Sequence, residues 1–507
     1  MRGWLKPKAR IDEGDVHRGM SMLLVDGACG QTMVVLTTGA FLVGFALLLG
    51  ASNKVIGLFA AIGPLSLTLQ IPAVYLVERL RRRRPLVLGT AGISRAAWLL
   101  IALLPWIAPR EYLVPVFLAA LFVHFGLGAV AGCAFNSWIR DLIPEARMSA
   151  FFAKRLALAT AIGAGLSLAG GYLVDFWKAH LGDPLGAYST LFAVAGSVGV
   201  VGIVFLGRTP EPQMPGEAGG GFFQALAEPF RNQAFRQLLI FLAWWSFAVN
   251  FAAPFFAVYL IDRLGLSMSW VLGLAVLSQL INVVCFQLWG SLADRFSNKS
   301  VLVLTGPWFI VSFLLWPFTT MPESYALTIP VLIVIHALAG VSTAGVNLCA
   351  GNLALKTAPY GKAGAYLAVN ALISGCAATI APIIAGFVAD WFASEQLTLT
   401  LHLASSENYH PAVVLPAVDL RGLDFVFLIA FLLGLFSLHR LLAVREEGEV
   451  QEKVVRQALF AEMRRTARQI STVAGVRQLI AVPWATARRL GGLRNRWGGD
   501  DTSRMPD

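Results

Sequence analysis

The segment VLGLAVLSQLINVVCFQLWGSLADR, residues Val271 to Arg295, decides the fold because an earlier segment repeats its plan. The earlier copy, VIGLFAAIGPLSLTLQIPAVYLVER, runs from Val55 to Arg79, an offset of 216 residues. This register places Gly57 over Gly273, and each copy ends in an acidic residue followed by Arg. An internal repeat of this length predicts a chain built from two copies of one plan.

A second pair of segments keeps almost the same spacing. GGYLVDFW, at residues 170–177, aligns with AGFVADWF, at residues 385–392, at an offset of 215 residues. The pair places Asp175 and Asp390 at equivalent helix ends, where charges are easily solvated, and we expect both acids to be structural. The repeat therefore extends over most of each half.

The whole chain is apolar enough to lie in a membrane. Of its 507 residues, 57% are apolar and 14% are charged, and its mean hydropathy is +0.68. Soluble domains carry about a quarter charged residues, so these charges are too few to cover several soluble domains. Twelve runs of about 18 or more residues with almost no charge predict an all-α integral membrane protein of twelve transmembrane helices. The predicted spans are residues 20–49, 54–77, 85–108, 112–137, 150–175, 186–206, 236–261, 268–292, 300–320, 326–350, 362–390 and 423–443.

Lys and Arg residues set the predicted orientation. With the N-terminus in the cytoplasm, all but six of the 40 Lys and Arg residues lie on the cytoplasmic side. Cytoplasmic loops carry such an excess, so we expect both termini inside and the protein in the cytoplasmic (inner) membrane. The exceptions are Lys54, Arg110, Lys178, Arg263 and Arg421 in outer loops, and Arg95 inside the third span.

The predicted organisation follows from the spans and the linker. Two pseudo-symmetric six-helix halves are joined by a segment rich in Pro, Gly and charge, and the second half contains one long outer loop. The parts are a cytoplasmic N-terminal segment (1–19), the first half (20–206), the linker (207–235), the second half (236–443) with its outer loop (391–422), and a basic tail (444–507).

Two segments lie outside the predicted bundle. The outer loop alternates apolar and polar residues in EQLTLTLHL and turns through SSENYHP, which predicts a small β-hairpin lid over the outer face. His402 and His410 in this loop lack the further spaced ligands of a metal site, so we expect none there. We expect the Arg-rich tail to lie against anionic lipid headgroups, and a docking surface for a partner is the alternative.

The segment GSLADRFSNK, residues 290–299, follows the eighth predicted helix and resembles the signature G-x-x-x-D-R-x-x-x-[KR] of the major facilitator superfamily. The equivalent loop after the second helix, VYLVERLRRRR, departs from this signature, with Val74 in place of Gly and Glu78 in place of Asp. Topology, motif and repeat extend the resemblance over residues 20–443. It implies a transporter whose two halves rock about a central site.

The resemblance also implies a gate on the cytoplasmic side. An Asp at the end of one helix can meet the positive amide end of a neighbour, and a Gly lets two helices approach closely. Such contacts would hold this side closed in one state and break when the halves rock. The alternative is that the basic residues only set topology. The implied gate residues are Gly290, Asp294, Arg295 and Lys299 and, by symmetry, Glu78, Arg79 and Arg83.

A second symmetric pair of loops follows the fourth and tenth predicted helices. WIRDLIPEARMSAFFAKR, residues 138–155, resembles a W-x-x-D-L-x-P-x-x-x-R pattern of bacterial facilitators. We expect Asp141, Arg147 and Arg155 to form a cytoplasmic salt-bridge network, with Lys362 at the position that repeats Arg147. Their expected role is to position helices rather than to contact substrate.

Asp26 and Arg95 lie inside the first and third predicted spans, where a charge is costly unless it is paired or faces water. At about 1.5 Å per residue, Asp26 lies ~9 Å and Arg95 ~15 Å into its helix, which allows the two side chains to pair. A carboxylate that exchanges an Arg partner for a proton is a simple coupling device, so this pair is the candidate coupling site. The alternative is that Arg95 extends to the membrane interface.

Polar residues on other spans are candidates for the substrate cavity. His336, Gly340, Thr343 and Asn347 are spaced by four, three and four residues, so they share one narrow face of the tenth helix. In the family that the chain resembles, helices 1, 4, 7 and 10 line the central cavity. The other cavity candidates on those helices are Thr37, His124, Ser246 and Asn250.

Enzyme motifs are absent from the sequence, which contains no GxxxxGK[ST], HExxH, GxSxG or CxxC. We therefore expect no catalytic residues, no metal ligands and no cofactor. The expected function is secondary active transport of a small organic solute by alternating access, coupled to protons, by a monomer that binds no nucleic acid. Import and export both fit. The alternative is a facilitator-like protein that no longer transports and serves as a membrane assembly factor or a sensor.

Overall fold

The computed structural model confirms twelve spans. Twelve helical segments of the described residues are long and apolar enough to cross a membrane. The described residues are 7–8, 10–214, 222–320, 324–359, 362–405, 408–444 and 446. The first-half elements are α1 (Glu13–Thr37), α2 (Ala40–Leu48), α3 (Asn53–Ser66), η1 (Leu67–Leu69), α4 (Gln70–Leu80), α5 (Arg83–Ile107), α6 (Arg110–Leu142), α7 (Glu145–Leu181) and α8 (Pro184–Gly207). The later elements are α9 (Phe222–Arg231), α10 (Gln233–Val258), η2 (Tyr259–Arg263), α11 (Met268–Arg295), α12 (Asn298–Leu315), η3 (Trp316–Thr319), α13 (Thr328–Thr357), α14 (Ala363–Trp391), η4 (Phe392–Ser394), β1 (Gln396–Ser405), β2 (Asn408–Arg421) and α15 (Leu423–Leu442).

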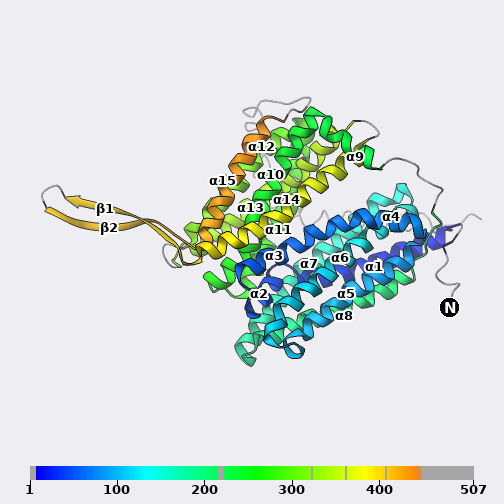
Figure 1. Ribbon diagram of the computed structural model, residues 1–507, viewed down its shortest axis with the longest axis horizontal. Coiled ribbons are helices and arrows are strands. Elements are labelled where there is room, and N and C mark those ends of the chain that lie inside the picture. Colours follow the sequence, from blue (N-terminus) through cyan, green and yellow to red (C-terminus); the bar gives the residue numbers. More distant parts are fainter. Residues whose placement is uncertain are drawn as a thin grey trace, which may run out of the picture.

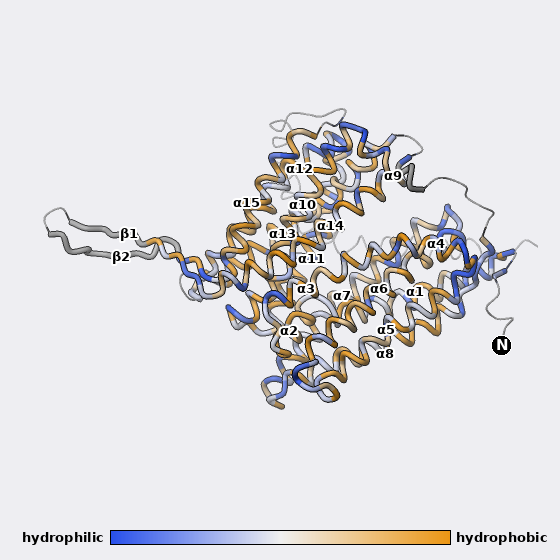
Figure 2. The backbone as a smooth tube through the Cα atoms, in the orientation of Figure 1, coloured by the Kyte–Doolittle hydropathy of each residue, from blue (hydrophilic) through white to orange (hydrophobic). Residues whose placement is uncertain are grey.

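The two halves lie close together at one end and diverge toward the other (Figure 1). We call the end with α2 and the base of the β-hairpin the hairpin end, and the end with α4 and α9 the linker end. α1 begins and α15 ends at the linker end (Figure 1). Hydrophobic residues follow the length of the spans, whereas hydrophilic residues gather near the two ends (Figure 2). This distribution is that of helices crossing a hydrocarbon layer.

Side-chain caps set where spans begin. The Asp12 carboxylate accepts a hydrogen bond from the backbone N–H of Asp15 at 2.6 Å, and α1 accordingly begins before the predicted residue 20. Asp183 caps α8 in the same way, accepting from the N–H of Gly186 at 3.1 Å. Both caps satisfy N–H groups that have no partner within their helix.

The prediction of one continuous first span at residues 20–49 is wrong. α1 ends at Thr37, and a separate helix, α2, starts at Ala40. Between them Gly39 has a φ of +59°, a backbone conformation that side chains other than glycine rarely adopt. The chain therefore turns at this glycine, and α2 lies at the hairpin end.

The hairpin end is where the halves pack most closely. A Cβ added at Gly57 of α3 would lie 2.1 Å from the carbonyl oxygen of Pro382 in α14, so only glycine fits. Gly386 of α14 likewise lies against the backbone of Asn53 at the start of α3. A Cβ at Gly171 of α7 would come within 2.9 Å of a side-chain atom of α11. Small residues thus allow the close approach of α3 to α14 and of α7 to α11.

The predicted β-hairpin is present, but it is not a lid. β1 and β2 pair antiparallel over residues 396–421. Figure 1 shows both strands running away from the helical bundle rather than across its end. The alternating pattern correctly predicted the local pairing, but it carries no information on the direction in which the two-stranded ribbon leaves the bundle.

Candidate functional site

Asp26 of α1 and Arg95 of α5 form an ion pair inside the first half. Nη1 of Arg95 donates to Oδ1 of Asp26 at 2.7 Å and to the carbonyl oxygen of Gly199 in α8 at 2.8 Å. Only 2% of the Asp26 surface is exposed. A Cβ at Gly202 would come within 2.6 Å of Arg95 and 3.0 Å of Asp26, so this glycine leaves room for the pair. The structure thus joins the two charged residues that lie within the first and third spans.

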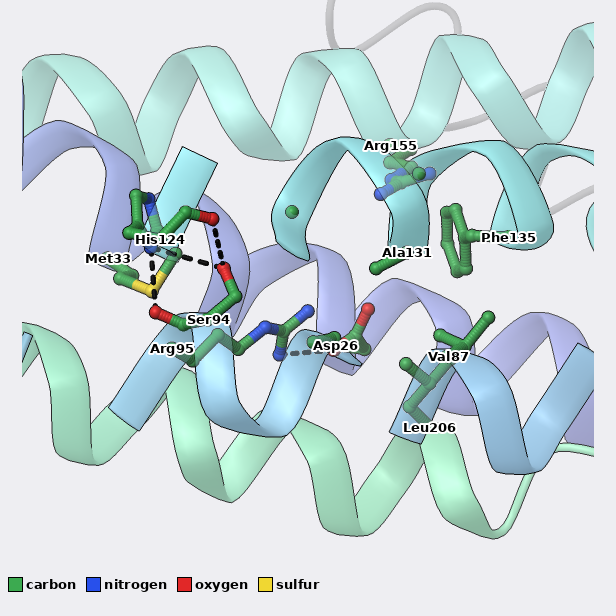
Figure 3. A pocket seen from close by; sticks show the side chains of 13 residues that line it. Asp26, Met33, Val87, Ser94, Arg95, His124, Ala131, Phe135, Arg155 and Leu206 are labelled. Atoms are coloured by element: carbon green, nitrogen blue, oxygen red, sulfur yellow. Dashed lines mark hydrogen bonds and ion pairs between the residues drawn. The ribbon is translucent and has the colours of Figure 1, made fainter. Parts of the chain in front are cut away.

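A cavity of about 290 Å³ surrounds this pair (Figure 3). Its walls come from α1, α5, α6, α7 and α8, which all belong to the first half. We call it the Asp26 pocket. Its residues with polar or charged side chains are Asp26, Ser94, Arg95, His124 and Arg155.

Arg155 occupies this pocket and not the predicted cytoplasmic network. Its guanidinium lies over the ring of Phe135, 5.3 Å from the ring centroid. A Cβ at Gly27 would lie 2.9 Å from Nε of Arg155, which shows how closely the side chain crosses α1. The loop pattern predicted a cytoplasmic position for Arg155, but the residue lies well inside α7 (Glu145–Leu181), and its side chain points inward, toward α1.

His124 lines the pocket but is already bonded at both ring nitrogens. Its Nε2 accepts from Nε1 of Trp98 at 3.3 Å, and its Nδ1 lies 2.8 Å from the carbonyl oxygen of Ser94. Because the indole N–H can only donate, Nε2 is the unprotonated nitrogen and Nδ1–H donates to Ser94. His124 is therefore a neutral packing residue in this arrangement.

The other predicted cavity residues are not gathered around the Asp26 pocket. Ser246 donates to the carbonyl oxygen of Ser374 at 2.9 Å, and Asn250 donates to that of Ser246 at 2.8 Å. Thr37, Thr343 and His336 hydrogen-bond to carbonyl oxygens four residues earlier in their own helices, and Asn347 is exposed. These residues lie on the expected helices, but the structure does not bring them together into one polar cluster with Asp26.

A second cavity, of about 360 Å³, lies between the halves. It is lined by α1 and α7 of the first half and by α11 of the second. Gln31, Thr160, Ser167 and Gln279 supply its polar groups, and no charged residue lines it. This interhelical space differs from the cavity implied by the family resemblance, because helices 5 and 8 line it instead of helices 4, 7 and 10.

The predicted gate residues of the first half make contacts within that half. Arg83 is completely buried, and its Nη1 pairs with Asp141. Arg147 pairs with Glu13 at 2.8 Å. Glu78 and Arg79 are exposed. The expected network of Asp141 with Arg147 and Arg155 is therefore wrong, because each of these residues has a different neighbour.

The gate residues of the second half follow the same rule. Asp294 and Arg295 are exposed, and Gly290 faces Leu348 of the same half, where a Cβ would lie 3.7 Å from that side chain. Lys362 pairs with Glu228 of α9 at 2.7 Å, and this hydrogen bond raises the pKa of Lys362. Among the described residues, the ion pairs of these gate residues do not join one six-helix half to the other.

Two glutamates that the sequence analysis did not single out bind the helix starts at the basic end of each motif. Glu211, after α8, accepts from the backbone N–H of Arg83 at the start of α5. Glu446, after α15, accepts from the backbone N–H of Lys299 near the start of α12 at 2.7 Å. Arg83 and Lys299 are equivalent at the repeat offset of 216, so each half caps an equivalent helix with a distant carboxylate. The long outer loop of the second half shifts Glu446 out of that register with Glu211, so the repeat in the sequence does not align the two glutamates.

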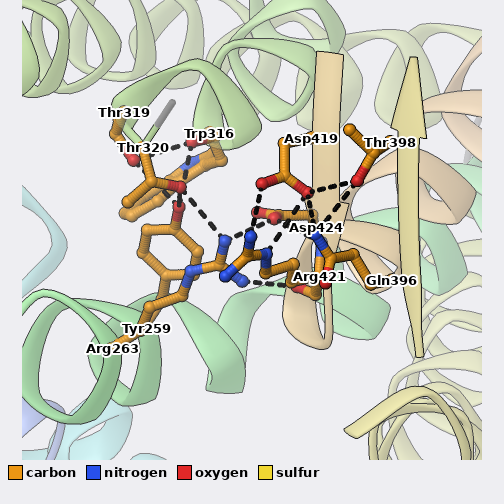
Figure 4. Close-up of polar contacts among 10 residues, drawn as sticks. All are labelled: Tyr259, Arg263, Trp316, Thr319, Thr320, Gln396, Thr398, Asp419, Arg421 and Asp424. Atoms are coloured by element: carbon orange, nitrogen blue, oxygen red, sulfur yellow. Dashed lines mark hydrogen bonds and ion pairs between the residues drawn. The ribbon is translucent and has the colours of Figure 1, made fainter. Parts of the chain in front are cut away.

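A further buried network anchors the base of the hairpin (Figure 4). Asp424 is fully buried and pairs with Arg263 at 2.8 Å, and Arg263 also donates to Thr320 at 3.1 Å. Next to it, Asp419 pairs with Arg421 at 2.8 Å. Burial opposes the charge of Asp419, but hydrogen bonds from Arg421 and Gln396 outweigh this effect and lower the pKa of Asp419.

Comparison with known proteins identifies the family. The sequence matches the family model of the Major Facilitator Superfamily over residues 27–382 and 288–490. The chain is also similar to the solved structure of the nucleoside transporter NupG, with 12% identity, a TM-score of 0.61, and coverage of 85% of this chain and 98% of that one. No curated protein sequence matches it significantly.

Two other solved structures agree on the fold. A D-xylose-proton symporter has 14% identity and a TM-score of 0.60, with 86% of this chain and 99% of that chain covered. A bacterial homologue of the iron transporter ferroportin, in an inward-facing state, has 13% identity and a TM-score of 0.60, with 86% of this chain and 99% of that chain covered. At these identities the likeness concerns the fold alone. With the family model matching most of its length, this twelve-span chain belongs to the major facilitator superfamily of membrane transporters.

Proposed function

We propose that the protein is a secondary transporter that carries a small organic solute across the inner membrane by alternating access, coupled to protons through Asp26. The observation that carries this proposal is the buried Asp26–Arg95 ion pair at 2.7 Å within an open pocket. Intramembrane ion pairs of this kind are costly to maintain and are typical of proton and substrate pathways.

Protonation of Asp26 would switch this ion pair between two states. With Asp26 ionised, Arg95 is bonded to Asp26 and to the Gly199 carbonyl, which ties α1 and α5 to α8. With Asp26 protonated, the charge pair is lost and Arg95 is released toward the pocket. A conformational equilibrium that differs between these two states would couple proton movement to rocking of the halves.

The arrangement of the halves supports an inward-open state. Asp175 and Asp390 bond across the halves at the hairpin end, whereas the gate residues at the linker end pair within their own half or with the linker. The excess of Lys and Arg supports a cytoplasmic location for the linker end, where α1 begins and α15 ends.

Flux into proteoliposomes tests the proposal. The full chain is reconstituted and challenged with nucleosides, D-xylose, 5-aminolevulinic acid and short carboxylates, with and without an inwardly directed pH gradient. We expect uptake of one class to rise with the gradient, and Asp26→Asn to abolish that dependence. Asp183→Asn is the matched control, because Asp183 caps α8 within one half and lies outside the pocket.

Two results would overturn parts of the proposal. If Asp26→Asn keeps full gradient dependence, Asp26 is not the coupling residue. If the folded protein moves none of these solutes, the alternative of a non-transporting assembly factor or sensor gains support. The retained pocket around Asp26 favours transport over that alternative, since a protein that no longer transports has no need of an open charged cavity.

A further inference from the structure

We infer that the Asp26 pocket binds a small organic carboxylate, held by Arg155 and by the Arg95 guanidinium that protonated Asp26 releases. This inference rests on the proposed function and specifies its substrate class. It also predicts that the anion and the proton travel in the same direction.

Arg155 gives the first argument, because its guanidinium has neither a hydrogen-bond acceptor nor an ion-pair partner among the described residues. It lies over the Phe135 ring and beside Gly27 of α1, and the Asp26 carboxylate interacts with it only through space. Arg95, Arg147 and Arg263 each have a carboxylate partner. A half-buried guanidinium facing a pocket is costly without an anion, so a bound anion would supply the missing partner.

The charge balance of the pocket gives the second argument. Asp26 carries one negative charge, and Arg95 from α5 and Arg155 from α7 carry two positive ones. His124 from α6 is bonded as a neutral ring, Cys29 lies beside Asp26 on α1, and α8 presents the Gly199 carbonyl and Leu206. The pocket is therefore positive by one charge with Asp26 ionised and by two with Asp26 protonated.

The third argument is competition for Arg95. Ionised Asp26 occupies Nη1 of Arg95 and compensates its charge, so a second carboxylate is attracted less strongly. Protonation of Asp26 removes the competitor and raises the positive charge of the pocket at the same time. Proton binding and anion binding therefore strengthen each other, and this coupling is reciprocal. A transporter with this linkage carries both ligands together.

Pocket size and walls narrow the ligand further. A volume of about 290 Å³ lies at the lower limit of ligand cavities. Met33, Val87, Phe135 and Leu206 supply apolar wall, which suits a ligand with a short carbon skeleton rather than an inorganic ion. Guanidinium groups bind a planar carboxylate through two parallel hydrogen bonds, a geometry that Lys cannot reproduce.

Calorimetry on the purified full-length protein in detergent tests the inference. The probes are propionate, lactate and hexanoate, each compared with its neutral amide, and inorganic phosphate. We expect a carboxylate to bind and its amide not to bind, with affinity rising as the pH is lowered. The affinity of Asp26→Asn should not change over the same pH range.

Variants of Arg155 supply a second test of the inference. We expect Arg155→Gln to weaken carboxylate binding by about 10- to 100-fold, and Arg155→Lys to restore only part of it. Lys154→Gln is the matched control, since it removes a neighbouring positive charge that is exposed and outside the pocket. If Arg155→Gln fails to fold, Arg155→Lys and the pH dependence of the wild-type protein decide the question.

Several results would overturn the inference. These are equal binding of amides, unchanged affinity in Arg155→Gln, weaker binding at lower pH, binding of phosphate alone, or binding of none of the carboxylates. The proposed function fails separately. Gradient dependence retained by Asp26→Asn rejects proton coupling even when carboxylates bind, and gradient-driven flux of a neutral solute rejects only the carboxylate class.

Discussion

Asp175 of α7 accepts a hydrogen bond from the backbone N–H of Met268, the first residue of α11, at 2.8 Å, so a carboxylate of one half caps a helix of the other. Its second oxygen accepts from the N–H of Ser269 at 2.8 Å. The repeat supplies the mirror contact, in which Asp390 of α14 accepts from the N–H groups of Asn53 and Lys54 at 3.2 and 3.3 Å. A carboxylate at a helix N-terminus is stabilised by the helix dipole.

These two symmetric caps predict a change in the balance between conformations. We expect the double variant Asp175→Asn and Asp390→Asn to open the hairpin end, because each cap contributes about 1 to 2 kcal/mol to its closed form. Spin-label distances between Leu181 and Leu327, in a background without native cysteines, would lengthen. Asp183→Asn is the control, since it neutralises an equivalent capping carboxylate inside one half. An unchanged distance distribution in the double variant would refute a role of the caps in closure.

Gly57 and its repeat equivalent Gly273 predict opposite effects of the same substitution. A Cβ at Gly57 would collide with the backbone of Pro382 at 2.1 Å, whereas nothing lies within 4 Å of a Cβ at Gly273. We expect Gly57→Ala to destabilise the protein by about 1 to 3 kcal/mol through overpacking. Gly273→Ala should be neutral or slightly stabilising, because Ala favours the helix. Thermal unfolding in detergent measures both, and equal effects would argue against the tight contact of α3 with α14.

We expect substitutions of Asp26 and Arg95 to have strongly non-additive effects on the free energy of unfolding. Arg95→Gln leaves the buried Asp26 carboxylate without its ion-pair partner, so we expect a loss of about 3 to 5 kcal/mol in the free energy of unfolding. The double variant with Asp26→Asn should recover most of that loss, since no unpaired charge remains. A double-mutant cycle on thermal or denaturant unfolding checks this. Additive losses would mean that the two side chains do not stabilise each other.

Glu446 predicts part of the acid sensitivity of the protein. Burial opposes the charge of Glu446, but hydrogen bonds from Asn298 and the Lys299 N–H outweigh it and lower its pKa. A lowered pKa in the folded state stabilises the fold above the unfolded pKa, and this contribution is lost as the pH falls through the folded pKa. We expect Glu446→Gln to flatten the acid limb of a stability–pH curve. An acid limb as steep as that of the wild-type protein would contradict this assignment.

Local pattern predicted the features that depend on neighbouring residues in the chain. Runs of apolar residues predicted the twelve spans, because a helix in lipid satisfies its own backbone. The alternation in EQLTLTLHL predicted β1, and the repeat paired Gly57 with Gly273 and Asp175 with Asp390. Helix depth at 1.5 Å per residue placed Asp26 and Arg95 at compatible levels, which the ion pair confirms.

Predictions failed where distant segments compete for the same side chain. Arg83 belongs to the motif expected at the gate, yet it is buried against Asp141 of its own half and Glu211 of the linker. Arg155 belongs to a loop pattern, yet its helix rotates it into the Asp26 pocket. Glu211 and Glu446 carried no local signal, because each caps a helix more than a hundred residues away.

The amino-acid sequence alone determined the membrane class, the number of spans, the repeat and the pair of intramembrane charges, since each follows from composition, period or depth along one helix. Only the tertiary structure decided which carboxylate meets which cation and which glycines lie between halves. It also decided that His124 is bonded at both ring nitrogens, whereas Arg155 lines the pocket with no hydrogen-bond partner among the described residues. The reason is geometric. An isolated helix can turn any of its faces toward a neighbour at equal free energy, and packing against the neighbouring helices selects one face.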